Sequence, residues 1–360
     1  MRILIACGGT GGHIFPGLSL YRALKKIHSD ADIILVLDKR ATTASIVTEE
    51  FPHVYLALAS PRFKFDLQDA FGVLQLLKGI LQSLKIIIRM RPEVVIGFGG
   101  YASFFPVFFS WIFRRKTIIH EANVVPGRAN RVLAYLVDKI AIGFAKTGDY
   151  FKANSSKVAL TGNPLRPNLT KLEKTLAYDF FGFYPNKFTI LVMGGSQGAH
   201  KINSAFINAV RLMEHKSEFQ FIHLCGAGDH SFLKGSYADL GVKARIFAFF
   251  SAMEYAYSAA DMVISRAGAT SISEIAIFGL PLILIPYPYV RMHQVKNARY
   301  FKEHNAAILI EEKELSPLIL KDKILELFDN PNLRESMSRN ILKLSRTQAD
   351  ESLVNLLLNE

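Results

Sequence analysis

The chain has 360 residues, of which 50% are hydrophobic and 21% are charged. This length is enough for one large domain or for two domains of about 150 to 180 residues each, and the composition excludes intrinsic disorder, a collagen-like repeat and a disulfide scaffold. The two cysteines, Cys7 and Cys225, each end an apolar stretch. They are therefore expected to be buried thiols in a protein of a reducing compartment.

The formal net charge of +12 is unevenly distributed along the chain. Residues 1–160 carry 21 Lys and Arg against 11 Asp and Glu, a net charge of +10, whereas residues 161–360 carry 22 against 20, a net charge of +2. A basic half is compatible with nucleic acid, an anionic membrane or an anionic substrate. The longest basic run is only Arg114, Arg115 and Lys116, so an ordinary solvated face is the alternative.

From the N-terminus onward, short β-branched runs alternate with amphipathic segments, which predicts a doubly wound α/β domain. Residues 3–7 form too short an apolar run for a signal peptide, and the N-terminus is expected to belong to the fold. Strands are expected at residues 2–7, 33–37, 54–57, 94–97, 117–120 and 139–142.

The longest uncharged stretch, residues 94–113, could span a bilayer on length alone. Gly97, Gly99, Gly100 and Pro106 interrupt it. We expect instead a short buried parallel strand, a glycine turn and a helix from about Tyr101.

The α/β pattern begins again in the second half of the chain, with strands expected at residues 188–193, 219–224, 262–265, 282–285 and 307–310. Residues 161–167 combine turn formers with two prolines and are the expected linker. The cleft between two such domains is the default site. Helical patterns in residues 331–360 are expected to cross back onto the first domain.

Glycine turns follow the first strand of each half, at residues 8–12 and at residues 194–198. Backbone N–H groups in such turns can approach an anion at the start of a helix, so two anionic ligands are expected. Neither turn fits a dinucleotide fingerprint, since Ile14 stands where the third glycine of the first would be, and neither has the Lys-Ser/Thr pair of a P-loop. Asp38 alone is weak support for a nicotinamide cofactor.

Glu274 lies about two helical turns inside a helix that follows the strand ending at Ser265. A carboxylate at this position can accept both hydroxyls of a ribose. A solvated helix residue is the alternative. Ile272, Ile275 and Ile277 beside it indicate a mostly buried helix and favour the functional role.

Seven motifs, in order, closely resemble the MurG family of N-acetylglucosaminyltransferases, which act on undecaprenyl-linked muramyl peptide, and they span essentially the whole chain. They are Gly8-Gly-Thr-Gly-Gly-His13 with Pro16-Gly17; Gly97-Phe-Gly-Gly-Tyr-Ala-Ser103; His120-Glu-Ala-Asn123 with Pro126-Gly127 and Ala129-Asn130-Arg131; Thr161-Gly-Asn-Pro-Leu-Arg166; Gly194-Gly-Ser-Gln-Gly-Ala199; Ser265 to Glu274; and Gln294 with Asn297-Ala298.

The resemblance implies an α/β fold of glycosyltransferase B architecture, with two Rossmann-like doubly wound parallel-sheet domains facing across a cleft. Residues 1–163 would form the lipid-acceptor and membrane-facing domain, residues 164–340 the UDP-sugar donor domain, and residues 341–360 a returning helix. The implied reaction is inverting transfer of N-acetylglucosamine from UDP-N-acetylglucosamine to the 4-hydroxyl of undecaprenyl-pyrophosphoryl-N-acetylmuramyl-pentapeptide, in peptidoglycan synthesis. No cofactor, metal or nucleic acid is implied.

Asp30 and Asp32 form the one Asp-x-Asp pair, which in other glycosyltransferases holds a metal on the donor diphosphate. They lie away from every glycine turn, so a solvated turn is the better interpretation. A related enzyme on another lipid, such as diacylglycerol, a nucleotide-sugar epimerase and a non-catalytic nucleotide-binding regulator are the alternative functions.

Carried over position by position, the resemblance implies a set of donor-binding residues. Arg166 would pair with phosphate, Glu274 would hold the ribose, and the backbone of Phe250 would read uracil. The whole implied donor set is Thr10, Gly11, Gly12, Asn123, Arg166, Ser196, Phe250, Ala269, Thr270, Ser271, Ile272, Ser273, Glu274 and Gln294. The chain departs from the family pattern at Ala122, at Ser251-Ala252 and at Arg291-Met292.

His13 is the candidate catalytic base, because a histidine side chain titrates near neutral pH and this one follows the first glycine turn. A histidine that only orients the loop is the alternative, and Glu121 is the second candidate base. UDP departure without metal would rely on Arg166 and on amides near Gly194 and Gly198.

A lipid acceptor implies contact with a bilayer. Leucines recur at helical spacing between Phe71 and Met90 beside basic residues, and Trp111-Ile-Phe113 precedes Arg114-Arg-Lys116. An apolar face ringed by cations suits an anionic membrane surface, with an amphipathic core helix as the alternative. The expected location is peripheral, on the cytoplasmic face of the bacterial inner membrane. The residues concerned are Leu74, Leu77, Leu81, Leu84, Lys78, Lys85, Arg89 and Arg91.

Overall fold

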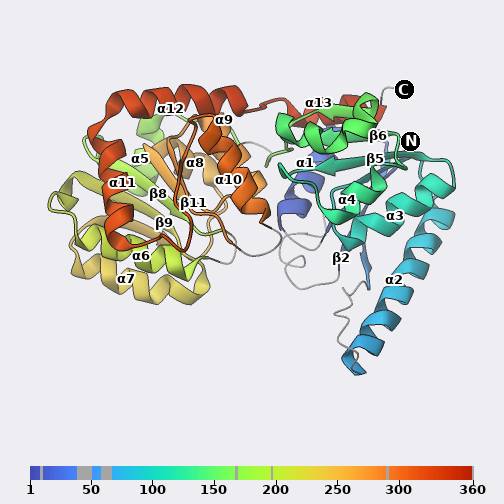
Figure 1. Ribbon diagram of the computed structural model, residues 1–360, viewed down its shortest axis with the longest axis horizontal. Coiled ribbons are helices and arrows are strands. Elements are labelled where there is room, and N and C mark those ends of the chain that lie inside the picture. The colour runs from blue at the N-terminus through green and yellow to red at the C-terminus, as the bar shows by residue number, and fades with distance from the viewer. Residues whose placement is uncertain are drawn as a thin grey trace. The chain divides into compact units, whose positions relative to one another are not determined.

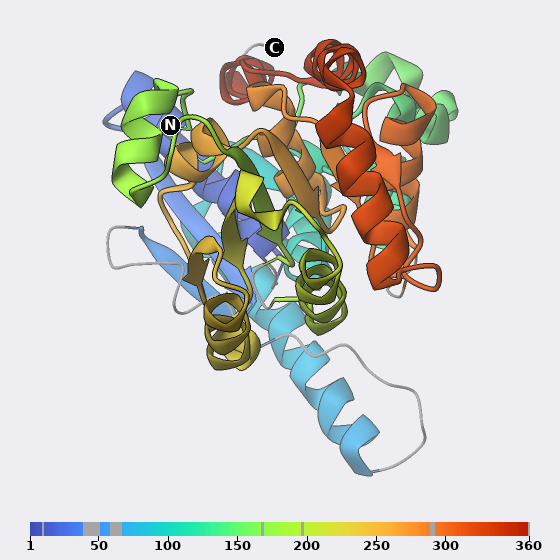
Figure 2. The same ribbon diagram turned by 90° about the vertical axis from the view of Figure 1, so that its left-hand side faces the viewer.

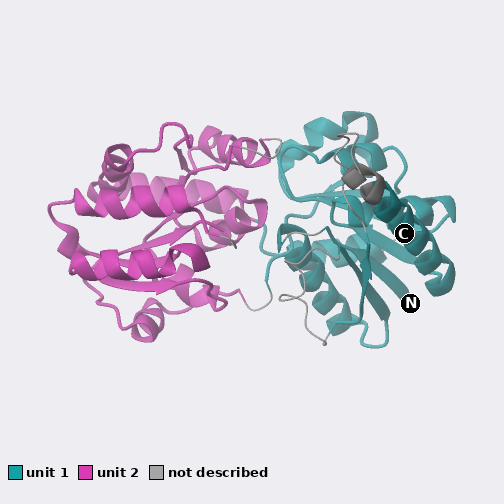
Figure 3. Cartoon of the chain, turned by 90° about the horizontal axis from the view of Figure 1, so that it is seen from below, with its two compact units in different colours: residues 1–167, 346–360 teal, residues 168–345 magenta. Residues whose placement is uncertain are grey.

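The computed structural model describes residues 1–8, 11–38, 51–57, 67–166, 169–195, 198–288 and 292–358, with only the backbone of residues 67–72. The chain divides into two compact units, drawn in different colours in Figure 3. Unit 1 comprises Met1–Pro167 and Arg346–Glu360, and unit 2 comprises Asn168–Ser345. The C-terminal segment of the chain is therefore part of unit 1.

Unit 1 contains a parallel sheet with seven strands in the described ranges (Figure 1). They are β1 (Arg2–Ala6), β2 (Asp32–Asp38), β3 (His53–Leu56), β4 (Val94–Gly97), β5 (Lys116–Glu121), β6 (Lys139–Ile142) and β7 (Val158–Leu160). Their order is β3-β2-β1-β4-β5-β6-β7. Every residue of β4 is buried, as expected for a central strand covered on both faces.

Helices cover both faces of this sheet. They are α1 (Gly11–Ile27), α2 (Leu67–Met90), α3 (Tyr101–Ile112), α4 (Arg128–Leu133) and α13 (Ala349–Leu358), with the 3-10 segment η1 (Ala145–Lys157). Alternate residues of β1 enter different cores because successive strand side chains point to opposite faces. Ile3 and Ile5 pack with α1 and α13, whereas Leu4 packs with α3 and α4.

Unit 2 repeats this architecture with six parallel strands in its described part. They are β8 (Phe188–Met193), β9 (Phe219–Leu224), β10 (Lys243–Phe247), β11 (Met262–Ser265), β12 (Leu282–Leu284) and β13 (Ile308–Leu309), in the order β10-β9-β8-β11-β12-β13. The helices are α5 (Lys174–Phe181), α6 (His200–Arg211), α7 (His230–Asp239), α8 (Met253–Ala259), α9 (Ala269–Phe278), α10 (His293–Glu303), α11 (Pro317–Asp329) and α12 (Pro331–Leu344), with the 3-10 turns η2 (Lys216–Glu218) and η3 (Ala227–Asp229).

All eleven strands expected from the sequence are present, within two residues at either end. The sequence pattern missed β7 and β10, each of which forms one edge of its sheet. β10 has no buried residue, and neither does β7. An edge strand pairs on one side only and needs no run of apolar residues, so it leaves a weak pattern.

Residues 94–113 form β4, a glycine turn and α3, as expected. Gly97 allows the strand to pack against this helix, because a Cβ at this position would lie 2.8 Å from Val107 Cγ2. Among the described helices, none combines the length and the apolar character needed to cross a bilayer.

Each sheet contains one topological switch point. Chain connections run outward in opposite directions from β1 and β4 in unit 1, and from β8 and β11 in unit 2. In open α/β sheets, ligands bind at the carboxyl ends of the strands at such points. The fold therefore marks one candidate position in each unit.

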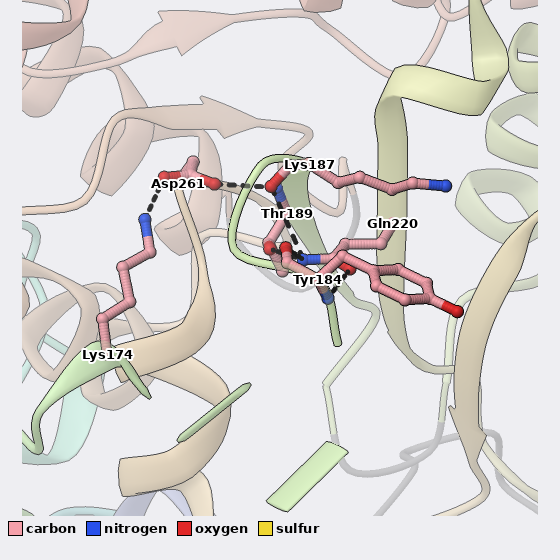
Figure 4. Close-up of polar contacts among 6 residues, drawn as sticks. All are labelled: Lys174, Tyr184, Lys187, Thr189, Gln220 and Asp261. Carbon is pink, nitrogen blue, oxygen red and sulfur yellow. Dashed lines mark hydrogen bonds and ion pairs between the residues drawn. The ribbon is translucent and has the colours of Figure 1, made fainter. Parts of the chain in front are cut away.

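A polar network joins the amino ends of three unit 2 strands, at the end of the sheet away from its switch point (Figure 4). Gln220 of β9 donates to the carbonyl of Tyr184 at 3.0 Å and to Thr189 Oγ1 at 2.9 Å. Asp261 accepts from the Thr189 amide at 2.7 Å and forms an ion pair with Lys174. This network ties α5 and the segment after it to the sheet.

The C-terminal helix α13 is attached to α1 through a buried carboxyl group. Ser19 Oγ contacts the carbonyl of Leu165 and also Asp350 Oδ2, the latter at 3.0 Å. A serine hydroxyl has one proton and a carbonyl can only accept. A protonated Asp350 that donates to Ser19 satisfies both contacts. Burial raises the pKa of Asp350 to about 6, so this protonated form predominates below pH 6 and the carboxylate is mostly ionised at pH 7.

Asp350→Asn is expected to stabilise the protein at neutral pH. Because the pKa is raised in the folded state, folding takes up a proton between about pH 4 and 6, and the free energy of unfolding falls as pH rises through this window. Above pH 6, the raised pKa of Asp350 lowers the free energy of unfolding by at most about 3 kcal/mol. Urea unfolding at pH 4 and pH 7 should show a gain that appears only at pH 7. Glu351→Gln, an exposed neighbour with the same charge change, is the control, and an equal gain from both variants would contradict the assignment.

Candidate functional site

Three motif segments meet at the carboxyl edge of the unit 1 sheet. Ala6 of β1 pairs with Gly97 of β4, which pairs with Ile119 of β5. The first glycine turn (residues 8–12), the second glycine turn (residues 97–100) and the segment around Asn123 therefore follow adjacent strands. Segments far apart in the sequence become neighbours because parallel strands end at the same edge.

His13 lies on the first turn of α1 and packs against both glycine turns. A Cβ at Gly8 would lie 2.5 Å from His13 Nδ1, and one at Gly99 would lie 3.4 Å from Nε2. Gly99 and Gly100 also have φ angles of +94° and +79°, which side-chain-bearing residues rarely adopt. The glycines thus serve to admit the imidazole ring of His13 at the unit 1 switch point. Gly11 and Gly12 begin the same helix.

The Glu121 carboxylate is the centre of a hydrogen-bond network at the end of β5. Oε1 accepts from the backbone and side-chain nitrogens of Asn123 at 3.0 and 3.1 Å. Oε2 accepts from the Gly127 amide at 3.0 Å and from Asn130 Nδ2 at 2.8 Å. Four donors on one buried carboxylate fix the loop that carries Asn123, a role that spacing alone did not reveal.

His120 is buried below this loop. Its Nε2 lies 3.0 Å from the carbonyl of Gly162, so Nε2 carries the proton of a neutral ring. Burial lowers the pKa of His120, with a smaller contribution in the same direction from His13. The two histidines are close enough to interact electrostatically, and His120 is held neutral.

Arg166 lies beside the start of α1. Its guanidinium carbon is 5.2 Å from the centre of the Phe15 ring, a cation–π distance. Phe15 in turn lies beside Gly11, where a Cβ would be 3.3 Å from the ring. The expected phosphate-pairing cation is therefore next to the first glycine turn.

Three further motif segments meet at the carboxyl edge of the unit 2 sheet. Ser265 of β11 pairs with Met193 of β8 on one side and with Leu284 of β12 on the other. The third glycine turn (residues 194–198), the start of α9 and the segment leading to α10 follow these strands. These three segments therefore lie together at the unit 2 switch point.

Two glycines of the third glycine turn, Gly194 and Gly198, have no room for a side chain. Gly195 and Gly198 have φ angles of +90° and +77°. A Cβ at Gly194 would lie 2.4 Å from the Ala199 amide nitrogen, and one at Gly198 would lie 2.1 Å from the Cys225 carbonyl oxygen. Glycine is required for backbone proximity at both positions.

Glu274 is buried on α9, with 1% of its surface exposed. The expectation of a mostly buried helix is confirmed, and Ala269 and Ile272 are buried with it, while Thr270, Ser271 and Ser273 are partly exposed. Tyr257 of α8 donates to Glu274 Oε2 at 2.9 Å. Tyr257 could not be singled out from the sequence, since its helix shows only an ordinary apolar pattern.

Gln294 lies in the first turn of α10, and its Oε1 accepts from the Tyr287 amide at 2.9 Å. This bond leaves the Nε2 side of the amide as a hydrogen-bond donor group. Arg266, another residue not singled out from the sequence, donates to the Ile285 carbonyl at 3.1 Å and lies 5.3 Å from the centre of the Tyr287 ring. Glu312 pairs with Arg266 at 2.5 Å.

Phe250 lies between β10 and α8 in an aromatic cluster. Its ring centre is 4.6 Å from that of Phe247 and 5.7 Å from that of Phe181. These contacts hold the backbone of residue 250 against unit 2. Thr10 and Ser196, also expected in the site, lie outside the described residues.

Cys7 and Cys225 are free and buried, as expected, and burial raises the pKa of both thiols. In the part of the chain that the structure describes, no three His, Cys, Asp or Glu side chains gather as a metal site would require. Asp30 lies in the turn before β2, and Asp32 is the first residue of that strand.

Two parallel-sheet units, each with a glycine turn and polar side chains at its switch point, define the glycosyltransferase B architecture. The chain belongs to glycosyltransferase family 28. It matches the N-terminal domain of that family over residues 3–142 and the C-terminal domain over residues 189–353.

Two curated relatives are similar over almost their whole length. Both are named UDP-N-acetylglucosamine–N-acetylmuramyl-(pentapeptide) pyrophosphoryl-undecaprenol N-acetylglucosamine transferase. The protein from Thermodesulfovibrio yellowstonii is 35% identical over 99% of this chain and 98% of its own, and that from Syntrophus aciditrophicus is 36% identical over 99% and 97%.

Solved structures share the fold. Acinetobacter baumannii MurG superposes with a TM-score of 0.79 and 22% identity, covering 100% of this chain and 99% of its own. A UDP-GlcNAc 2-epimerase from Neisseria meningitidis bound to UDP-GlcNAc gives a TM-score of 0.68 at 14% identity, covering 100% of both chains. The fold is thus common to transferases and epimerases, whereas the family match is to transferases.

Proposed function

We propose that this protein transfers N-acetylglucosamine from UDP-N-acetylglucosamine to the 4-hydroxyl of undecaprenyl-pyrophosphoryl-N-acetylmuramyl-pentapeptide, with inversion at the sugar carbon. Full-length similarity to transferases of this name supports the reaction. The observation that carries the donor assignment is Glu274, which is buried on α9, the helix that follows the strand paired with the one before the third glycine turn.

The donor would be held mainly by unit 2. Glu274 is suited to the ribose hydroxyls, with Tyr257 fixing one of its oxygens, and the backbone near Phe250 is suited to uracil. The Nε2 group of Gln294 is a donor for a sugar hydroxyl, because Tyr287 occupies its oxygen. Asn123, held by Glu121, would contact the sugar from unit 1.

In this mechanism the acceptor hydroxyl attacks the sugar carbon while UDP departs from the opposite face. A base must remove the hydroxyl proton, and we assign this role to His13. Glu121 is less suited, since four donors already bind its carboxylate. Arg166 and backbone amides of the third glycine turn would stabilise the charge that develops on UDP.

A transfer assay tests the proposed function. Labelled UDP-N-acetylglucosamine and a short-chain muramyl-pyrophosphoryl lipid should give a disaccharide lipid and UDP, in the presence or absence of EDTA. Without the lipid, the nucleotide sugar should stay intact. Conversion of UDP-N-acetylglucosamine in the absence of acceptor would indicate an epimerase, and transfer to diacylglycerol alone would indicate a different lipid transferase. Loss of more than about tenfold with EDTA, restored by Mg²⁺, would contradict the charge-stabilising role given to Arg166.

We also propose that unit 1 docks on an anionic membrane, at the cytoplasmic leaflet. Helix α2 runs outward from the body of this unit (Figures 1 and 2). Leu74 is 63% exposed and Leu81 is 66% exposed, which argues against an ordinary core helix. The apolar face consists of Val73, Leu74, Leu77, Leu81 and Ile88 of α2 with Trp111, Ile112 and Phe113 at the end of α3.

Exposed cations accompany these apolar side chains along α2 and after the ends of α2 and α3. Lys78, Lys85 and Arg89 project from α2, and Arg91 and Arg114 follow the ends of α2 and α3. Each basic residue near an anionic surface contributes about 1 kcal/mol, so four or five together suffice for reversible attachment. Apolar side chains between cations then fit the headgroup region of a bilayer.

Vesicle co-sedimentation measures this attachment. Wild type should pellet with anionic vesicles at low salt and be released at high salt. A variant with Lys78, Lys85, Arg89 and Arg114 changed to Gln should stay in the supernatant and keep near-normal activity on a water-soluble acceptor analogue. Equal pelleting of both proteins, or equal binding to neutral vesicles, would contradict the membrane-binding role and show that this face is ordinary solvated surface.

A further inference from the structure

A second polar network, buried at His223, Asn203 and Tyr237, lies in unit 2 next to the third glycine turn. It links β9, η3, α6 and α7, and it begins at His223, which is completely buried near the carboxyl end of β9. Neither the sequence motifs nor the proposed mechanism uses these side chains. Its members are His200, Asn203, His223, Asp229 and Tyr237.

The proton positions in this network follow from its acceptors. Asn203 Nδ2 lies 2.9 Å from the Cys225 carbonyl and 2.7 Å from Asp229 Oδ2, so it donates to both. Asn203 Oδ1 must then accept from His223 Nε2, which lies 3.0 Å away. The other ring nitrogen, Nδ1, carries no proton and accepts from the Tyr237 hydroxyl at 2.9 Å.

The electrostatics agree with these positions. Burial lowers the pKa of His223 to about 3, against a smaller opposing effect of Asp229, so the ring is neutral at physiological pH. Burial raises the pKa of Asp229, but hydrogen bonds from His200 and Asn203 outweigh it, and its pKa lies below the usual value. A neutral imidazole and an ionised carboxylate are the forms that every contact in the network requires.

The network ends on the backbone of the third glycine turn. The Cys225 carbonyl that Asn203 holds is the atom against which Gly198 packs, with room for no side chain between them. Asp229 also contacts His200 Nδ1 at 2.8 Å, and His200 is the first residue of α6. Gly198, at the end of the turn, and the start of the helix after it are thus linked to the same five side chains.

We infer that His223 is a positioning residue for glycosyl transfer: through Asn203 it holds Gly198, at the end of the third glycine turn, and the start of α6 in the geometry that receives the donor diphosphate. This inference rests on the proposed function, which assigns the diphosphate to that turn. His223 touches no substrate. Its effect should therefore fall on the diphosphate part of the donor and leave the nucleoside part unchanged.

Inhibition of the transferase by UDP and by uridine separates these two parts. His223→Leu removes both ring nitrogens, and its inhibition constant for UDP should rise about tenfold or more, while that for uridine stays within twofold. His223→Gln can still donate to Asn203 and accept from Tyr237, so it should recover most of the UDP affinity. The KM for the donor should rise in parallel with the UDP constant.

Gln220 provides a matched control on the same strand. It is completely buried on β9, but its partners Tyr184 and Thr189 lie at the opposite end of the sheet (Figure 4). Gln220→Leu should lower the thermal midpoint, as His223→Leu does, without changing the UDP constant. If both variants lose stability and neither loses UDP affinity, the network is merely structural and the inference is wrong.

Two further variants keep the result interpretable. Tyr237→Phe removes only the hydroxyl that donates to His223 Nδ1, and it should raise the inhibition constant of UDP. This variant replaces His223→Leu as the test if the leucine variant does not fold. Unchanged UDP inhibition in a folded Tyr237→Phe protein would overturn the inference. Glu274→Gln should weaken both UDP and uridine, and if it weakens neither, the proposed donor site fails independently of His223.

Discussion

Replacing His13 with Gln is expected to lower kcat by about 10²- to 10⁴-fold, the usual contribution of a positioned general base. The side chain occupies a space that Gly8 and Gly99 leave open, and glutamine fits there without adding bulk. The variant should keep the donor KM and the UDP inhibition constant near those of wild type, because the donor is assigned to unit 2. A steady-state assay with saturating acceptor measures both parameters.

The pH profile separates a base from a residue that only orients the loop. In wild type, kcat/KM should fall on the acidic side as the base becomes protonated, and this limb should be absent in the His13→Gln variant. Glu121→Gln is the comparison, because it replaces an acceptor oxygen with a donor group facing Asn130 or Asn123 and should mainly destabilise the loop. Loss of the limb in the Glu121 variant alone would transfer the base role to Glu121.

Replacing Glu274 with Gln is expected to raise the donor KM by roughly 10- to 200-fold. A hydrogen bond to a charged group contributes about 1.5 to 3 kcal/mol, and the variant loses the charge that a ribose diol would use. Since Tyr257 can still donate to the amide oxygen, the fold of α8 against α9 should be kept. The inhibition constants of UDP and uridine should rise together.

Tyr257→Phe tests how Glu274 is held. It removes the hydroxyl 2.9 Å from Oε2 and leaves the carboxylate in place, so the donor KM should rise less than in the Glu274 variant. A donor KM and a kcat within twofold of wild type in a folded Glu274→Gln protein would show that the ribose is bound elsewhere.

The strands and the glycine turns could be predicted from the sequence because their signals are local. β4 and β8 are mainly apolar runs, as expected for central parallel strands, and each leads into a glycine turn. The helix containing Glu274 could be recognised as buried from the isoleucines around it. The edge strands β7 and β10 could not be predicted, since a strand paired on one side only does not need a run of apolar residues.

The partners of the site residues depended on the tertiary structure. Tyr257 reaches Glu274 from another helix, and Asn203 reaches His223 from another element, with no spacing in the sequence to announce either contact. The sequence was enough to identify His13 as a candidate base. It could not show that the His13 ring explains the glycine at position 99, which lies 86 residues further along the chain. Hydrogen bonds between elements form only after the elements have packed.

The sequence by itself determined the α/β class, the position of most strands and the family to which the motifs belong, because apolar periodicity and glycine turns are properties of short segments. The tertiary structure alone decided which turns lie side by side. Strand order placed β4 beside β1 and β11 beside β8, and so put His13 and Glu274 at the two switch points. Strand order is set by the packing of helices on both faces of a sheet, which no single segment of sequence encodes.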